Sequence, residues 1–186
     1  MGILRYKQLS FPMETTTDGA FPTREKENEM GNFIKATKSQ VEELTAISKA
    51  AFDTDISVGA NEVGGPPEYD SVTWHYKMQR LGNLYALLED DIIVGGALLF
   101  RENKEPQVLY VGRIFVAPQY HRKGYGIELM HCIEQTFSDV QFLRLETPVW
   151  NVRTYAFYGK CGFCEMYRDN ESVYFEKRIV SKDKRE

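Results

Sequence analysis

Cysteine is scarce in this sequence, and no apolar run is long enough to cross a membrane. The chain of 186 residues contains three cysteines, and so small and odd a number excludes a disulfide framework. The longest uncharged apolar run, IIVGGALLF at 92–100, is far shorter than the roughly 20 residues of a membrane-spanning helix. The N-terminal residues lack an apolar segment followed by a small-residue cleavage site, so we expect no signal peptide. These absences predict a cytoplasmic protein with no membrane partner.

An excess of positive charge is also absent. The chain has 23 Lys and Arg residues against 27 Asp and Glu residues, for a formal net charge of −4. This balance argues against a nucleic-acid partner, because the phosphate backbone selects basic surfaces. The hydrophobic content of 42% and the aromatic content of 13% are too high for a disordered chain. The length therefore fits one domain with a core of its own.

Two of the cysteines form the motif CGFC at 161–164, which has the spacing of a redox dithiol. A redox cysteine normally lies at the start of a helix, where the helix dipole lowers the thiol pKa. Cys161 instead follows the helical pattern of residues 151–160 and meets the carbonyl end of that helix. A zinc site would need two further ligands at a matching spacing, and the adjacent residues His131 and Cys132 fit poorly. We expect structural cysteines and no metal, with a thiol redox protein as an alternative.

Residues 1–31 have no hydrophobic period, and we predict a tail or arm there, followed by one domain at 32–182. Apolar residues at helical spacing predict helices at 38–52, 71–81, 125–138 and 151–160. Alternating or β-branched runs predict strands at 32–37, 84–90, 92–102, 106–117, 141–147, 163–168 and 172–180. Residues 53–70 are a long acidic loop rich in Gly and Pro, and loops of this length are often functional.

The order of these elements predicts an α+β fold with a mixed sheet. In sequence they run strand, helix, helix, three strands, helix, strand, helix and two strands. The strand–helix–strand unit between residues 106 and 147 predicts a parallel pair joined by a right-handed crossover. Strands connected without a helix predict antiparallel pairs.

The segment HRKGYG at 121–126 joins a predicted strand to a predicted helix. It is not a dinucleotide fingerprint, because the third glycine is absent, and it is not a P-loop, because no Ser or Thr follows Lys123. The first N–H groups of the helix are nevertheless available to an anion, and Arg122 and Lys123 add positive charge. Gly124 and Gly126 would let an oxyanion approach the backbone. These features predict a pyrophosphate-binding loop.

Two motifs, in this order, resemble the GNAT superfamily of acyl-CoA-dependent N-acetyltransferases. The first is RIFVAPQYHRKGYGIELM at 113–130, and the second is NVRTYAFYGKCGF at 151–163. The resemblance covers roughly residues 32–180, with one departure: His121 stands where the family pattern has Gln or Arg. It implies the GNAT-like fold, in which a central parallel strand pair splays apart, and acetyl-CoA as the co-substrate.

By this resemblance, acetyl-CoA lies in the gap between the strands at 106–117 and 141–147. Phe115 and Val116 are implied to bind it through their backbone groups, and Asn151 is implied to lie beside the cofactor arm. The residues implied to form the pyrophosphate-binding loop are His121, Arg122, Lys123, Gly124, Tyr125, Gly126 and Ile127.

Acyl transfer from a thioester needs an oxyanion donor, which a backbone amide of the splayed strand can supply, and a donor for the leaving sulfur. The resemblance implies Tyr158 as that general acid, with Tyr155 as the neighbouring alternative. A tyrosine pKa near 10 lies above a thiol pKa of about 8.5, so complete proton transfer is uphill by about 2 kcal/mol. We therefore expect Tyr158 mainly to hydrogen-bond the sulfur. Glu146, near the end of the strand at 141–147, is the candidate base.

The acidic loop at 53–70 is expected to form the acceptor pocket. Glu68 and Asp70 would attract a cationic amine, and Tyr69 and Trp74 would line its apolar or cation–π wall. The acceptor is a small-molecule or peptide amine, and a homodimer is left open. The predicted function is N-acetyl transfer from acetyl-CoA to a primary amine by direct attack on the thioester. The alternative is a catalytically silent acetyl-CoA-binding sensor or regulatory module.

Overall fold

The computed structural model describes residues 32–101 and 103–179. The tail predicted for residues 1–31 and the last three residues of the predicted domain lie outside these ranges. The described strands and α-helices, in chain order, are β1 (Asn32–Lys35), α1 (Val41–Asp53), α2 (Val72–Arg80), β2 (Leu84–Glu89), β3 (Ile92–Arg101), β4 (Val108–Val116), α3 (Tyr125–Thr136), β5 (Phe142–Pro148), α4 (Val152–Lys160), β6 (Cys164–Arg168) and β7 (Ser172–Arg178). None of the described helices is long and apolar enough to cross a membrane.

The seven described strands form one mixed sheet with the order β1-β2-β3-β4-β5-β7-β6. β4 and β5 are parallel and are joined through α3, whereas each of the other neighbouring pairs is antiparallel. The predicted α+β class, the order of the elements and the parallel crossover are therefore confirmed.

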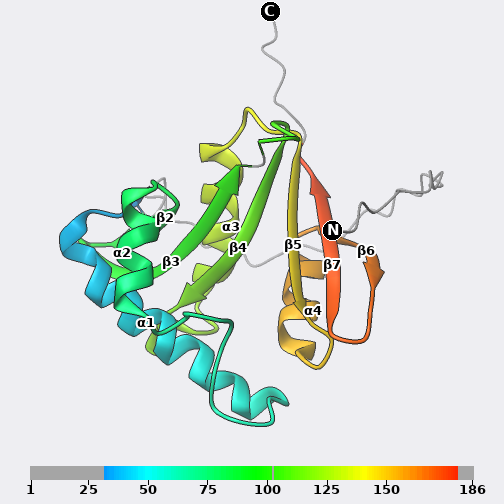
Figure 1. Cartoon of the computed structure of the whole chain (residues 1–186), viewed down its shortest axis with the longest axis horizontal. Coiled ribbons are helices and arrows are strands. Elements are labelled where there is room, and N and C mark those ends of the chain that lie inside the picture. The colour runs from blue at the N-terminus through cyan, green and yellow to red at the C-terminus, as the bar shows by residue number, and fades with distance from the viewer. Residues whose placement is uncertain (1–31, 102, 180–186) are drawn as a thin grey trace, which may run out of the picture.

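The two faces of the sheet carry separate apolar cores. On one face, α1 and α2 pack on β2, β3 and β4, with Leu44 of α1 and Phe115 of β4 in the same buried cluster. On the other face, Leu129 of α3 and Tyr158 of α4 belong to a second buried cluster. Figure 1 shows α1 and α2 in front of the left half of the sheet and no helix in front of β5, β7 and β6. Among the described residues, no helix covers the α1/α2 face of these last strands, and this is the open face of the sheet.

The helices begin where local side-chain chemistry predicts. Gln40 Oε1 accepts a hydrogen bond from the Thr37 N–H at 2.9 Å and starts the 3-10 turn η1 (Lys38–Gln40) that leads into α1. Ser71 Oγ accepts from the Trp74 N–H at 3.3 Å at the start of α2. Capping side chains satisfy amides that have no partner inside the helix, so these boundaries could be read from sequence.

β4 and β5 separate along their length. They pair only at their first residues, where Val108–Tyr110 lie opposite Phe142–Arg144. A register shift against β3 then leaves Gly112 as an extra residue in β4, which bends the strand as β-bulges do. A Cβ on Gly112 would lie 2.6 Å from the Phe100 ring, so a larger residue would not fit there. Beyond the bulge the two strands diverge down to Val116 (Figure 1), and the predicted splay is confirmed.

Candidate active site

The hydrogen bonds between β3 and β4 decide which backbone groups of β4 face the gap. The Ala117 N–H donates to the Val94 carbonyl at 2.9 Å, and in an antiparallel pair every second residue directs its backbone groups to the same neighbour. Phe115, two residues earlier and opposite Gly96, therefore also faces β3. Val116, between them, directs its N–H and C=O to the gap.

The prediction that Phe115 offers its backbone to a ligand is therefore wrong. Its side chain is buried, and a Cβ on Gly96 would lie 2.8 Å from the Phe115 ring. Its carbonyl oxygen lies only 2.5 Å from the position of a Cβ on Gly95, on the β3 side of the strand. Phe115 thus holds β4 against β3 and α1, and Val116 is the residue placed to meet a ligand in the gap.

His121 connects the following loop to this same residue. Its Nε2 lies 2.8 Å from the Val116 carbonyl oxygen, a contact that requires the proton to be on Nε2. The His121 backbone N–H is also engaged, with the Pro118 carbonyl at 3.1 Å. A carbonyl oxygen has two lone pairs, so Val116 can accept a second hydrogen bond from a ligand. His121 therefore fixes the start of the loop relative to the gap.

The loop before α3 is shaped by two residues in the left-handed conformation, Arg122 with φ of 61° and Gly124 with φ of 98°. A Cβ on Gly124 would have no neighbour within 4 Å, so conformation rather than crowding favours glycine there. The Lys123 ammonium lies 5.2 Å from the Tyr120 ring. The dipole at the start of α3 and the exposed Arg122 and Lys123 side chains make this loop suited to an anion.

The first turn of α3 packs closely on α4. Tyr125 is buried and packs edge-to-face on Tyr120, with 5.5 Å between the ring centroids, whereas Ile127 is exposed. A Cβ on Gly126 would lie 3.1 Å from the Phe157 ring of α4. Gly126 therefore allows the two helices to approach each other, and this packing, rather than access for an oxyanion, is what the structure requires of it.

Tyr158 extends from α4 into the core on the α3/α4 side of the sheet. Its ring packs against Phe163 and Phe175 with centroid distances of 5.7 and 6.0 Å. Burial raises its pKa well above the usual range, and nearby Cys161, Tyr110 and Asp55 raise it further. None of the described residues forms a hydrogen bond with its hydroxyl. The phenol is therefore a neutral group that can donate a hydrogen bond but will not readily give up its proton.

Asn151 caps α4 and also holds the segment between α1 and α2. Its Oδ1 accepts from the Thr154 N–H at 3.1 Å, and its Nδ2 donates to Asp55 Oδ2 at 3.1 Å. Asp55 lies in the 3-10 turn η2 (Thr54–Val58) and also forms an ion pair with Arg153. Both ends of the Asn151 amide are thus engaged within the protein, and its contact with a cofactor arm stays a prediction.

Sequence reasoning placed Asp55 only among the acids of the loop that would attract a cationic amine, and did not predict its contact with Asn151. Asp55 is 8% exposed, and burial raises its pKa although Arg153, Asn151 and His121 act in the opposite direction. Because Asp55 influences Tyr158 as well, these side chains surround one region at the divergent end of β4 and β5. In the sequence Asp55 was only one of several acids in the loop 53–70, and nothing local distinguishes it from the others.

Glu146 lies on β5 opposite Tyr174 of β7. Leu143 and Leu145 belong to the core on the α3/α4 side, so the alternation of the strand places Glu146 on the open face, where it is exposed. Burial first and the Glu146 charge second raise the pKa of Tyr174. The Glu146 carboxylate is therefore accessible from the α1/α2 side of the sheet, and its role as the base stays a prediction.

Two of the predicted acceptor residues are exposed. Glu68 and Asp70 both lie on the surface of the loop before α2, and Glu68 has a left-handed φ of 66°. Tyr69, between them, is attached to α1: its hydroxyl donates to Asp53 at 3.0 Å, and its carbonyl accepts from Ser48 at 2.8 Å. Tyr69 therefore anchors the loop, and only its two acidic neighbours extend freely into solvent.

Trp74, the fourth predicted acceptor residue, faces the sheet. The guanidinium carbon of Arg113 on β4 lies 4.6 Å from the centroid of its ring. Arg113 also donates a hydrogen bond to the Pro67 carbonyl. The acceptor-side loop and β4 are thus connected through this arginine, which no local sequence signal distinguishes from other basic residues.

The first cysteine of the CGFC motif lies in a setting that disfavours a thiolate. Cys161 follows the last residue of α4, and burial raises its thiol pKa to about 11. The two cysteines are free, and the described residues contain no cluster of metal-ligating side chains. A thiolate nucleophile is disfavoured at this position.

Comparison with known proteins adds a family assignment to this geometry. The sequence profile described as the acetyltransferase (GNAT) family matches residues 46–163. The curated protein YrkN of Bacillus subtilis (strain 168), which is uncharacterized, is 33% identical over 92 residues, or 48% of this chain and 49% of YrkN. The chain therefore spans about half the length of this curated relative.

Two solved structures have the same fold. The PaiA N-acetyltransferase of Thermoplasma acidophilum, solved in complex with coenzyme A, has a TM-score of 0.63 at 18% identity, covering 79% of this chain and 98% of that chain. The ribosomal-protein-S18-alanine N-acetyltransferase of Escherichia coli has a TM-score of 0.56 at 15% identity, covering 84% and 98%. At such identities the two structures establish the shared fold alone.

Proposed function

The chain belongs to the acetyltransferase (GNAT) family, and we propose on this premise that it transfers the acetyl group of acetyl-CoA to a primary amine by direct attack on the thioester. The observation that carries this proposal is the divergence of β4 from β5. It leaves the Val116 peptide facing a gap that begins beside the anion-binding loop and passes Tyr158. A thioester in this gap would have a backbone donor on one side and a phenol on the other.

The residues proposed to hold acetyl-CoA follow from this placement. The Val116 C=O would bond the pantetheine arm as an added strand does, and the Val116 N–H would be the oxyanion donor. The amides from Arg122 to Gly126 would hold the pyrophosphate, with the side chains of Arg122 and Lys123 adding charge, whereas the Ile127 N–H already donates to the Gly124 carbonyl at 3.0 Å. His121 contributes by fixing this loop to Val116, and Asn151 by shaping the end of the gap.

Tyr158 is proposed to donate a hydrogen bond to the departing sulfur. Its raised pKa makes complete proton transfer to the thiolate more unfavourable than for a free tyrosine. The leaving thiolate would therefore be stabilised by a hydrogen bond and would take its proton from solvent after it leaves. This argument favours the hydrogen-bonding role over that of a strong general acid.

Glu146 is proposed as the base that accepts the proton of the acceptor ammonium. Deprotonating a lysine-like amine at pH 7 costs about 4.6 kcal/mol, whereas an α-amino group costs only about 1 kcal/mol. An exposed carboxylate on the open face can serve through a water molecule when the amine has a low pKa. The contribution of Glu146 therefore depends on the acceptor, and it should be largest for the most basic amines.

The proposal is tested by an acceptor screen that reads the release of free thiol from acetyl-CoA. The panel contains small amines, amino acids, peptides with free N-termini and peptides with lysine side chains, because the related Escherichia coli structure is a protein N-acetyltransferase. We expect thiol release above the background of hydrolysis for at least one class. Binding of CoA without release by any amine would overturn the proposal in favour of a sensor or regulatory module.

The thiol redox alternative has a separate test. Replacing Cys161 and Cys164 with serine should leave acetyl transfer unchanged, since neither thiol belongs to the proposed site. A loss of transfer in this double variant, with the fold retained, would make the cysteines part of the chemistry and contradict the mechanism.

A further inference from the structure

Arg113 carries a positive charge that the described protein does not neutralise. Its Nη2 donates to the Pro67 carbonyl, and its guanidinium lies over the Trp74 ring at 4.6 Å. Its Nη1 is buried and has no hydrogen-bond partner. Among the described residues, none of the ion pairs includes Arg113. Its guanidinium thus contacts a neutral carbonyl and a neutral ring, and its Nη1 group has no acceptor.

This arrangement costs free energy that a purely structural arginine would avoid. Burial lowers the pKa of Arg113, and the charge of Glu68 only partly opposes this effect. A buried cation is normally paired, because desolvation of an unpaired charge is expensive. Neighbouring His75 supplies no negative charge, because an imidazole is either neutral or cationic; it is fully buried, and burial is the main cause that lowers its pKa. The uncompensated charge therefore points to an anion supplied from outside the chain.

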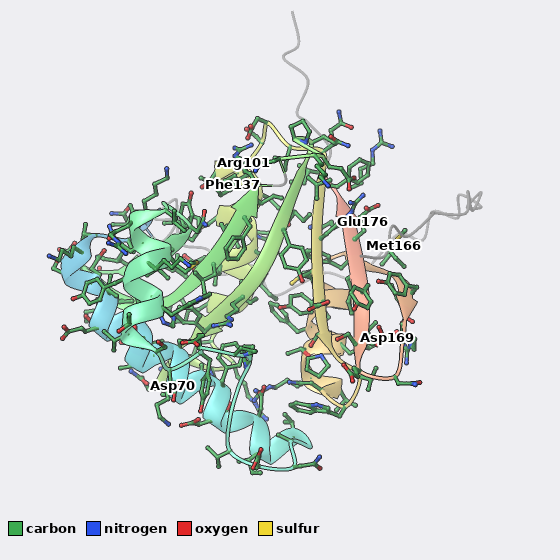
Figure 2. The ribbon with its side chains drawn as sticks, viewed as in Figure 1. Asp70, Arg101, Phe137, Met166, Asp169 and Glu176 are labelled. Atoms are coloured by element: carbon green, nitrogen blue, oxygen red, sulfur yellow. The ribbon has the colours of Figure 1, made fainter. Side chains whose placement is uncertain are left out.

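A second arginine of the same protein, Arg101, stacks on an aromatic ring and also has a carboxylate partner. Arg101 lies over the Phe137 ring at 5.2 Å, and it also forms two hydrogen bonds to Asp139, at 2.8 and 3.0 Å. Figure 2 shows Arg101 and Phe137 at the opposite end of the sheet from Asp70. Both arginines stack on an aromatic ring, and Arg113 alone of the two lacks the carboxylate.

The position of Arg113 identifies the molecule that would bring this anion. It lies on β4 directly after the Gly112 bulge and shares the α1/α2 face of the sheet with Phe115. Continuing the parallel register from Tyr110 opposite Arg144, with the bulged residue added, brings Arg113 level with Glu146 across the gap. An acceptor approaching from the open face would therefore meet the Arg113 cation and the Glu146 carboxylate together.

We propose that Arg113 binds a carboxylate of the acceptor, so that the acceptor class is an amine that also carries a carboxylate, as amino acids do. This inference rests on the proposed acetyl transfer. A carboxylate would replace the neutral Pro67 carbonyl, because a charge-assisted pair with a guanidinium is stronger and can be bidentate. It would also give the Nη1 group the acceptor it lacks.

A carboxylate fits better than a phosphate. One guanidinium neutralises a single negative charge, and Glu68, whose charge acts on Arg113, would repel a doubly charged group together with its neighbour Asp70. The amine of the same acceptor is cationic in solution, and these two exposed carboxylates would attract it. The acceptor-side surface thus offers one cationic contact and several anionic ones, which is the charge pattern of a zwitterion.

The first experiment compares matched acceptors in the thiol-release assay. Amino acids are tested against their own amides, and phosphoethanolamine is tested against ethanolamine. The wild-type protein should prefer the acid over the amide by about tenfold or more in kcat/KM, as expected for a hydrogen bond to a charged group. Equal use of acid and amide, or a preference for the phosphate-bearing amine over the amino acids, would overturn the proposal.

Variants assign the preference to Arg113. Arg113→Met should remove it, and Arg113→Lys should keep only part of it, because lysine retains the charge without the planar fork. Arg101→Met is the matched control and should leave the preference intact. If the methionine variant does not fold, the lysine variant decides: an undiminished preference in Arg113→Lys would contradict a bidentate pair.

A binding measurement separates this inference from the proposed function. The sequence has two tryptophans, and in a Trp150→Phe background the fluorescence of Trp74 reports directly on the guanidinium over its ring. Titration with N-acetyl amino acids should change this emission, whereas their amides should not, and Arg113→Met should abolish the change. Because no turnover is needed, absence of thiol release together with this response would refute acetyl transfer and retain the carboxylate site.

Discussion

The side-chain amide of Asn151 donates a hydrogen bond to the carboxylate of Asp55 at 3.1 Å, across 96 positions of the sequence. Asn151 starts α4 on the β5 side of the gap, and Asp55 lies in the segment that follows α1 on the β4 side. The hydrogen bond therefore connects the two sides where the strands have moved apart. In Figure 1 the segment between α1 and α2 crosses below the open end of β4 and β5.

Removing the Asp55 carboxylate should destabilise this connection. Asn151 is 1% exposed. In Asp55→Ala its Nδ2 group loses the acceptor, and an unsatisfied buried donor costs about 1–3 kcal/mol. Asp55→Asn keeps one acceptor oxygen and should cost less. Urea unfolding at neutral pH measures both, and equal stability of the alanine variant and the wild type would contradict a structural role for this hydrogen bond.

The raised pKa of Asp55 gives a signed pH dependence. The folded state holds the Asp55 proton more tightly than the unfolded state, whose pKa is near the ordinary value of 3.8, so the contribution of this group to stability falls as pH rises. This loss begins near pH 3.8 and ends above the raised folded pKa. The stability difference between wild type and Asp55→Asn should therefore shift against the wild type as pH increases through this window. A shift in the other direction would mean that Arg153 and Asn151 outweigh burial.

Tyr158→Phe should lower kcat while leaving CoA binding nearly intact. The lost hydrogen bond to a developing thiolate corresponds to a roughly 10- to 100-fold decrease in kcat, within the range for hydrogen bonds to charged groups. Tyr155→Phe is the control, because Tyr155 is exposed and its hydroxyl donates to Glu165 at 3.0 Å instead. Calorimetric titration with CoA and steady-state rates measure the two effects. An unchanged kcat in Tyr158→Phe would remove this residue from the mechanism.

His121→Ala should weaken CoA binding about fivefold. The imidazole holds the anion-binding loop to Val116 by one hydrogen bond, whose net value of about 1 kcal/mol corresponds to this factor. Arg122→Ala and Lys123→Ala should weaken CoA binding in a way that salt screens, whereas the effect of His121→Ala at neutral pH should depend little on salt. Tighter CoA binding by His121→Ala would show that the histidine competes with the cofactor for the Val116 carbonyl.

Two glycines provide a matched test of how β4 is positioned. Gly95→Ala places a Cβ 2.5 Å from the Phe115 carbonyl oxygen, so β3 and β4 must move apart, at a cost of about 1–3 kcal/mol. Gly159→Ala, in α4 with open space around the new methyl group, should instead stabilise the protein by up to about 1 kcal/mol. Thermal unfolding compares the pair. Equal effects of the two substitutions would mean that the close contact at Gly95 relaxes freely.

The elements and their order could be predicted because their signals are local. Helical spacing of apolar residues, the Ser71 cap and the Gly124 turn all act within a few positions. In the structure α2 and α3 begin directly after Ser71 and Gly124. The parallel pair of β4 and β5 followed from a strand–helix–strand unit and the right-handed crossover it imposes. The motif resemblance added the splay and the family, both of which were confirmed.

The orientation of individual residues could not be predicted to the same degree. Phe115 and Val116 are adjacent, and only the register with β3 decides that Val116 faces the gap. A shift of one residue exchanges the two faces of a strand, and periodicity within β4 alone does not fix that register. Gly126 was interpreted as access for a phosphate, yet the ring it approaches belongs to a helix that begins 26 positions later.

The sequence by itself determined the succession of strands and helices, the glycine turn that starts α3 and the position of Tyr158 in α4, since these depend on neighbours within a turn or two. Only the tertiary structure decided which distant side chains meet. It placed Asp55 on Asn151 and left Arg113 between Trp74 and Pro67 without a carboxylate. Such contacts depend on how loops return across the sheet, and loop paths follow from the packing of the whole domain rather than from the residues within them.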